Sequence, residues 1–179
     1  MAHKEQQDFC NEVKKRYPDY FDGVTAIDIG SLDVNGNNRG LFTNSEYVGL
    51  DIAEGKNVDV VSIAHKWKSP RKFDTVLSTE ALEHDMHYDK TLRRMAGLTK
   101  SGGLMFFTAA TTGREEHGTI AKHTWTSPNT TKIPKWQNYY KNLTEDDIRA
   151  AIEVDKLFSI YEFQINQNSN DIYFWGIKK

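Results

Sequence analysis

The sequence has little of what several classes of protein require. It holds a single cysteine, Cys10, so no disulfide can form within the chain, and we expect a reducing, cytoplasmic setting. No apolar run approaches the ~20 residues that span a bilayer, and the polar start MAHKEQQD is not typical of a signal peptide. The net charge of −2 argues against unspecific attraction to nucleic acid or to an anionic membrane. We therefore expect one soluble domain over residues 1–179, and self-association stays open.

Apolar spacing predicts helices and strands that alternate along the chain. Phe9, Val13 and Tyr17 recur every four residues and predict an N-terminal helix within residues 1–20, which Pro18 ends. A second helix is expected at 88–98, and a third after Thr144, a residue typical of a helix N-cap. Glycines at 102 and 103 predict a break before a buried strand. Strands are expected at 24–29, 46–50, 58–62, 73–78 and 104–110, and as a closing hairpin of 158–165 and 171–177.

This order predicts an α/β fold, a Rossmann-like three-layer sandwich. Its seven-stranded sheet is expected to be mostly parallel and to end in an antiparallel hairpin. Residues 110–140 have no sustained period and are expected to form a long excursion, a lid or a substrate-binding segment. Ligands of such sheets bind at the carboxyl ends of the strands.

The stretch VTAIDIGSLDVNGN, residues 24–37, leads from the first strand into a polar loop. A dinucleotide loop, G-x-G-x-x-G, needs its second glycine where this chain has Leu32, and Asp33 beside it would repel phosphates. Asp51 ends the second strand, where an acid can accept hydrogen bonds from ribose hydroxyls. The loop thus favours a nucleoside without phosphates, above all a cationic one. In the competing interpretation, Asp28 and Asp51 only form turns at strand ends.

Four motifs resemble those of class I S-adenosylmethionine-dependent methyltransferases, in the same order and spacing. Asp28-Ile29-Gly30-Ser31 is similar to the opening motif of that family, and Asp51 in YVGLDI to its second acid. The run FDTVLSTEALEH, residues 73–84, resembles the F-D-x-V-x-x-x-x-x-L-E-H signature of the family. LTKSGG, residues 98–103, resembles its L-K-P-G-G turn. The resemblance covers about residues 24–177.

The resemblance implies S-adenosylmethionine as cofactor and S-adenosylhomocysteine as product. The turn after Asp28 would then lie under the methionine part, Asp51 would hold the ribose, and residues after the second and third strands would contact the adenine. An acid that is common in the family is missing at Ile63. The implied cofactor residues are Asp28, Gly30, Ser31, Leu32, Asp51, Ile52, Ile63, Ala64 and Thr79.

The methyl acceptor is harder to predict. Because the sulfonium is already a strong methyl donor, the protein mainly has to position the acceptor, and a hydroxyl acceptor also needs a base. Candidate catalytic residues are His84, His117 and Glu80. In the competing interpretations, His84 packs or caps at a helix start, Glu80 is a solvated acid at a helix start, and His117 belongs to a solvated charged run. The charged run after the fifth strand and an aromatic tract in the excursion suggest contacts with the substrate. In the competing interpretations, the charged residues face the solvent and the aromatic residues fill a core. These candidates are Arg114, Glu116, Tyr139 and Tyr140.

The chain lacks the Asn/Asp-Pro-Pro-aromatic signature of amino-methylating enzymes and a basic stripe for nucleic acid. We therefore expect a small acceptor, preferably a hydroxyl of a sugar or other metabolite. Two alternatives remain. One is a catalytically inactive methyltransferase-like binding module. The other is a metal-dependent enzyme that uses His84, His87 and His117, with Glu80 and Glu83 nearby.

Overall fold

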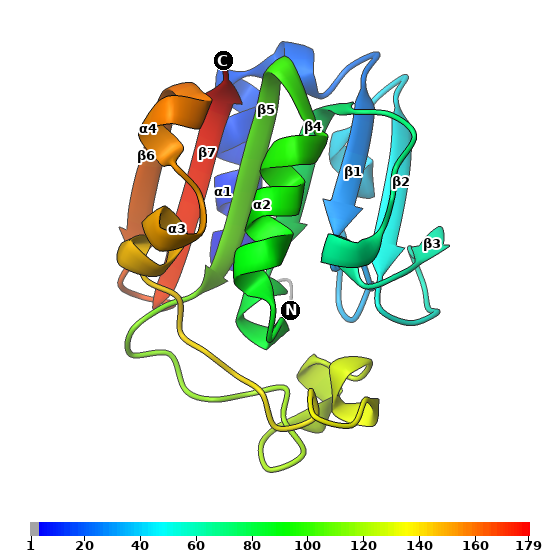
Figure 1. Ribbon diagram of the computed structural model, residues 1–179, viewed down its shortest axis with the longest axis vertical. Coiled ribbons are helices and arrows are strands. Elements are labelled where there is room, and N and C mark those ends of the chain that lie inside the picture. The colour runs from blue at the N-terminus through cyan, green and yellow to red at the C-terminus, as the bar shows by residue number, and fades with distance from the viewer. Residues whose placement is uncertain (1–3) are drawn as a thin grey trace.

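A single seven-stranded sheet organises the chain, in the order β3-β2-β1-β4-β5-β7-β6 (Figure 1). The computed structural model describes residues 4–179, so the first three residues of the predicted N-terminal segment lie outside the described residues. Strands β1 to β5 pair in parallel, and β7 lies antiparallel between β5 and β6. The predicted sheet with its closing hairpin is confirmed. The strands are β1 (Thr25–Ile29), β2 (Glu46–Asp51), β3 (Val60–Val61), β4 (Phe73–Thr79), β5 (Thr99–Ala110), β6 (Phe158–Asn166) and β7 (Asp171–Lys178).

Helices cover both faces of this sheet (Figure 1). On one face, Phe9 and Val13 of α1 (Lys4–Arg16) pack into a buried cluster with aromatic residues of β5 and β7. On the other face, Leu92 and Met95 of α2 (Tyr88–Leu98) share a second cluster with Ile148 of α3 (Glu145–Ala151). The short α4 (Val154–Leu157) follows α3 on this side. Two apolar clusters separated by the sheet make the three-layer sandwich that the sequence predicts. Within residues 4–179, no helix combines the length and the apolar character needed to cross a membrane.

The connections of β1 to β2 and of β3 to β4 contain no α-helix. Between β1 and β2 the chain forms only a 3-10 turn, Arg39–Leu41, and between β3 and β4 another, Ala64–Lys66. The connecting sequence SLDVNGNN lacks the apolar spacing that would hold a helix against the sheet.

The predicted break before β5 is not a break in the strand. β5 begins at Thr99 and runs through the glycines, with Gly102 at φ +73°. The disturbance is confined to the pairing with β4, whose register shifts between Phe73 and Thr75. A left-handed glycine thus produces an irregular strand start.

The long excursion connects β5 to α3 and lies beyond the carboxyl ends of the parallel strands (yellow in Figure 1). It contains two 3-10 turns, Thr124–Thr126 and Thr130–Lys132. Its ends are tied to the sheet, because Leu143 N donates to Ala110 O at 2.8 Å. The segment is therefore placed over the edge where a ligand of this fold binds.

The N-terminus of α3 gives a stability prediction. Thr144 and Asp147 form a capping box: the Thr144 hydroxyl accepts from Asp147 N at 3.2 Å, and the Asp147 carboxylate accepts from Thr144 N at 3.0 Å. Thr144→Ala is expected to lower the free energy of unfolding by about 1 kcal/mol, measured by urea denaturation. The exposed Thr112→Ala is the control, with an expected change within about 0.5 kcal/mol. An equal loss in both variants would contradict the capping role.

Candidate functional site

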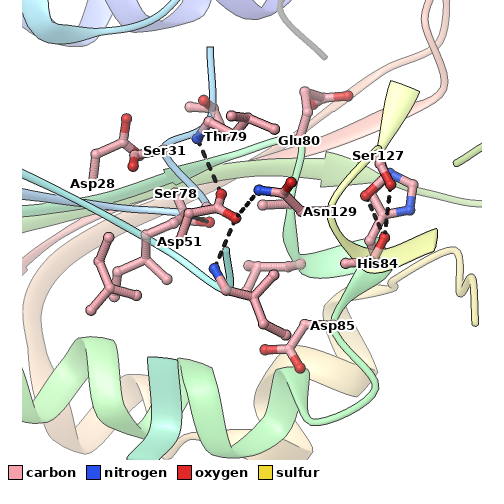
Figure 2. A pocket seen from close by; sticks show the side chains of 18 of the residues that line it. Asp28, Ser31, Asp51, Ser78, Thr79, Glu80, His84, Asp85, Ser127 and Asn129 are labelled. Atoms are coloured by element: carbon pink, nitrogen blue, oxygen red, sulfur yellow. Dashed lines mark hydrogen bonds between the residues drawn. The ribbon is translucent and has the colours of Figure 1, made fainter. Parts of the chain in front are cut away.

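A cavity opens at the carboxyl ends of β1, β2 and β4, where the strand order reverses (Figure 2). This is the position at which open α/β sheets bind ligands, because loops diverge there to opposite sides of the sheet. Each residue that the sequence assigns to a cofactor lines this cavity. They are Asp28, Gly30, Ser31, Leu32, Asp51, Ile52, Ile63, Ala64 and Thr79.

Gly30 makes the tight turn out of β1. It has φ +81°, and a Cβ atom on it would lie 2.3 Å from the Cβ of Ala81. Only glycine fits both conditions. The amides of Gly30 and Ser31 both donate to Leu50 O, at 2.8 and 3.1 Å. Because no α-helix follows within residues 31–45, the loop offers no helix N-terminus to a phosphate.

Asp28 is buried at the end of β1, with 2% of its surface exposed. Burial raises the pKa of its carboxyl to about 6, and the nearby Asp51 adds to the rise. The Tyr47 hydroxyl donates to one of its oxygens and acts in the opposite direction. A positive charge placed in the cavity would favour the ionised form of Asp28.

Asp51 links three separate segments (Figure 2). One carboxylate oxygen accepts from Leu32 N at 3.1 Å. The other accepts from Ile52 N at 2.8 Å and from the Asn129 side chain at 3.0 Å. Asn129 belongs to the excursion and also donates to Ala53 O at 3.3 Å. Since a carboxylate accepts about four hydrogen bonds, little capacity remains for two ribose hydroxyls while Asn129 is in place.

The chain leaves β4 through a strained turn that carries the candidate catalytic residues. Glu80 has φ +52° and is 5% exposed, and its amide bonds to Thr108. The following 3-10 turn, Leu82–His84, places His84 at the cavity wall, 3% exposed. Neither ring nitrogen of His84 has a hydrogen-bond partner among the described residues. Burial, and next the neighbouring His117, lower the pKa of His84, so its imidazole is neutral near pH 7.

The excursion brings His117 against His84. The centroids of the two rings are 5.0 Å apart at an interplanar angle of 85°, and the Tyr140 ring lies 5.7 Å from His84. The backbone of Gly118 packs on the same ring: a Cβ there would lie 2.5 Å from His84 Cε1. Glu83, which is fully buried, has one oxygen 3.9 Å from His84 Nε2. Burial, and then the charge of Glu80, raise the pKa of Glu83.

The predicted substrate residues lie outside the set that lines the cavity. Arg114 forms an ion pair with the buried Asp171 at 3.1 Å and thereby anchors the excursion to β7. Glu116 accepts from the Thr119 hydroxyl at 2.8 Å. Tyr139 is half-buried, and Tyr140 packs on the two histidines. Their substrate roles remain predictions.

His87 and Cys10 do not belong to the cluster that His84 and His117 form. The His87 ring packs on His65, at 4.8 Å, and on Trp136, at 5.9 Å, so the metal alternative loses this member. Glu83 takes its place, because one ligand atom from each of Glu83, His84 and His117 lies within 4.8 Å of the others. Burial raises the pKa of Cys10 to about 12, which leaves it an unreactive thiol.

Several lining residues escaped sequence analysis. Gln6 on α1 and Asn38 after the first loop meet at 3.4 Å, and Asn38 donates to the Thr79 hydroxyl at 2.9 Å. Residues 126–130 and Trp136 of the excursion line the other side. Only the general expectation of a lid pointed to the excursion, and nothing local distinguished Asn129 from its neighbours.

Comparison with known proteins identifies a matching sequence family and solved structures with the same fold. The sequence model of a family described as methyltransferase domain matches residues 3–146. Among curated proteins, none matches the chain.

Solved structures share the fold at low sequence identity. The 1,6-didemethyltoxoflavin-N1-methyltransferase of Burkholderia thailandensis, solved with S-adenosylhomocysteine, is 12% identical, with a TM-score of 0.65 over 97% of this chain and 78% of its own. The magnesium protoporphyrin IX methyltransferase of Synechocystis, also solved with that product, is 15% identical, with a TM-score of 0.62 over 98% and 84%. The N-terminal domain of EvdMO1, solved in the presence of S-adenosylhomocysteine and D-fucose, is 15% identical, with a TM-score of 0.62 over 100% and 85%.

Asp28 predicts a pH dependence of cofactor affinity. Cationic S-adenosylmethionine favours the ionised carboxylate, whose pKa in the free protein is about 6. Below pH 6 binding must release a proton, so the dissociation constant is expected to rise by up to about tenfold per pH unit. Calorimetry between pH 5 and 8 measures it. Asp28→Asn should flatten the profile, and an equally steep profile in that variant would assign the proton to another group.

Asn129 predicts a variant that binds cofactor more tightly. If the ribose and Asn129 compete for Asp51, Asn129→Ala removes a hydrogen bond that the free protein must give up. With about 0.5–1.5 kcal/mol for that bond, the dissociation constant of S-adenosylmethionine should fall about 2- to 10-fold. Calorimetry with the exposed Thr112→Ala variant as the control measures the effect. Weaker binding by Asn129→Ala would show instead that Asn129 holds the cofactor.

Proposed function

We propose that this chain, which belongs to the methyltransferase domain family, methylates a hydroxyl group of a small molecule. It is an S-adenosylmethionine-dependent methyltransferase, with S-adenosylhomocysteine as the product. The acceptor that we propose is a sugar or another hydroxylated metabolite. The presence of D-fucose in the EvdMO1 structure supports a sugar by analogy of fold alone.

The residues that line the cavity suit the parts of S-adenosylmethionine. Asp51 would accept the ribose hydroxyls once Asn129 gives way, and Ile52, Ile63 and Ala64 would lie against the adenine. The backbone turn at Gly30 would hold the methionine part, where Asp28 would offset its positive charge. Glu80 and His84 also line this cavity and would be available to the acceptor.

The surroundings of His84 are the observation that supports a hydroxyl as the methyl acceptor. A neutral amine can attack the methyl carbon with its own lone pair, whereas a hydroxyl must lose its proton. His84 lines the cavity with both ring nitrogens lacking a hydrogen-bond partner among the described residues. Such a buried, neutral imidazole can accept a proton or hold a group that does. Positioning of the acceptor in line with the methyl group supplies up to about 7–11 kcal/mol more.

An inactive binding module is the weaker alternative. The left-handed Gly30 lies against Ala81, and the carboxylates of Asp28 and Asp51 are buried at adjacent strand ends beside the cavity. Burying carboxylates is costly to stability, so their presence at the cavity supports a site in use.

A transfer assay tests the proposal. The protein is incubated with methyl-labelled S-adenosylmethionine and either sugars and other polyols or matched amines, and labelled product and S-adenosylhomocysteine are measured. Label is expected in the hydroxylated acceptors. His84→Gln should lower kcat about 10²- to 10⁴-fold while the cofactor dissociation constant stays within about twofold. Asp51→Ala, which should lose cofactor binding, is the negative control.

Two results would count against the proposal. Label found in amines alone would replace the hydroxyl by a nitrogen acceptor. Tight binding of S-adenosylmethionine without turnover on any acceptor would favour the inactive module.

A further inference from the structure

We infer that Glu83, His84 and His117 form a binding site for one divalent transition-metal ion, beside the cofactor cavity. One ligand atom of each residue lies within 4.8 Å of the other two, and all three residues are buried. The binding of the ion does not depend on the proposed function. A contact between the ion and the acceptor oxygen does rest on the proposed function.

The geometry requires only a small contraction. An ion with bonds of about 2.0–2.1 Å holds tetrahedral ligands about 3.3 Å apart, so the widest separation in the cluster would close by about 1.5 Å. His84 Nε2 and the nearer Glu83 oxygen are already 3.9 Å apart. These two residues lie in the 3-10 turn Leu82–His84 after β4, and His117 comes from the excursion, whose Gly118 packs on His84.

The hydrogen bond of His117 fixes its tautomer. Its Nδ1 lies 2.9 Å from the carbonyl oxygen of Glu115, which can only accept, so Nδ1 carries the proton and donates. The lone pair is then on Nε2. Ligating histidines commonly donate their other ring nitrogen to a carbonyl or carboxylate in this way, which fixes both tautomer and ring orientation.

Glu83 and His84 supply the second, independent observation. Glu83 is 0% exposed and His84 is 3% exposed. Neither oxygen of Glu83 and neither ring nitrogen of His84 has a hydrogen-bond partner among residues 4–179. Leaving such groups buried without hydrogen bonds costs several kcal/mol, and a bound cation removes that cost by using these lone pairs.

The donor set selects the class of ion. Imidazole nitrogens suit zinc, iron and nickel, whereas magnesium and calcium prefer all-oxygen sites. Two imidazoles and one carboxylate leave at least one coordination position open on a four-coordinate ion. His84 lines the cavity, on the far side from Asp28 (Figure 2), so the cluster borders the place where the acceptor must meet the methyl group.

The step that this site would assist is a simple displacement. The acceptor hydroxyl binds the ion, which lowers the pKa of the hydroxyl, and its proton passes to water. The oxygen lone pair then forms a bond to the methyl carbon while the carbon–sulfur bond breaks. Its electron pair stays on sulfur, which becomes the neutral thioether of S-adenosylhomocysteine. No oxidant or reductant is needed.

Metal binding is tested on the whole chain without cofactor. Chelator-treated protein is titrated with Zn²⁺, Mn²⁺ or Co²⁺, with Mg²⁺ as the comparison, and followed by calorimetry, by thermal unfolding and by the visible spectrum of Co²⁺. One ion per chain is expected, with a higher Tm and Co²⁺ bands typical of nitrogen and oxygen ligands. Absence of binding by all three transition-metal ions would overturn the site.

Matched variants test the ligand set. Glu83→Gln and His117→Gln are each expected to weaken binding at least tenfold and to lose the Tm shift. His87→Gln, whose ring packs on His65 and Trp136, should keep full affinity. Because Gln matches the shape of Glu and has no charge to bury, Glu83→Gln should fold, which its unfolding curve in chelator verifies. Equal loss in His87→Gln, or none in Glu83→Gln, would overturn the assignment.

The transfer assay then separates the two proposals. Loss of methyl transfer in chelator, restored by the bound ion, supports the role in acceptor binding. Full transfer in chelator overturns that role and leaves His84 as a base. One bound ion with no transfer to any hydroxyl would refute the proposed function while the metal site stands.

Discussion

The site depends on the hydrogen bonds of one carboxylate, that of Asp51. Its two oxygens join the loop after β1, through Leu32 N, to the end of β2, through Ile52 N. They also hold the excursion, through Asn129. No α-helix follows β1 before β2 within the described residues, so polar contacts hold this loop: besides Asp51, they include Asp33 N donating to Lys56 O at 3.0 Å and the Asn57 side chain donating to Ser31 O at 2.9 Å. The acid for which we propose contact with the ribose therefore also orders the cavity wall, and in that role it would exchange the hydrogen bond from Asn129 for hydrogen bonds from the ribose.

The parts of the structure that the sequence predicted share a physical basis. Strand positions follow from short apolar runs, and α2 and α3 from apolar spacing and the Thr144 cap. Parallel pairing then brings the carboxyl ends of β1, β2 and β4 to one edge, so that residues far apart in sequence line one cavity. The places of Asp28, Gly30 and Asp51 at this cavity could be predicted because each stands at a strand end, where the local pattern alone fixes its place.

What could not be predicted is set by contacts that no local pattern encodes. Asn129 and Asp51 are 78 residues apart, and Arg114 and Asp171 are 57 apart. The excursion has few apolar residues at regular spacing, so its path is decided by such polar pairs. Arg114 illustrates the difficulty: a basic residue after β5 suggests an anion-binding role, yet a buried carboxylate on β7 takes it as a structural partner. Likewise, the sequence placed Glu83 only near a possible metal site, and no local pattern showed that its side chain is fully buried.

The excursion connects the two halves of the site. Asn129 contacts Asp51 on the cofactor side, and His117 contacts His84 on the acceptor side. Both ends of the segment are anchored, by the Arg114–Asp171 ion pair and by Leu143 N on Ala110 O. A movement that frees Asp51 must therefore take place between these anchors, in residues that belong to the same connected stretch as His117. The contact with Asp51 and the arrangement of the His84–His117 pair therefore depend on one anchored segment.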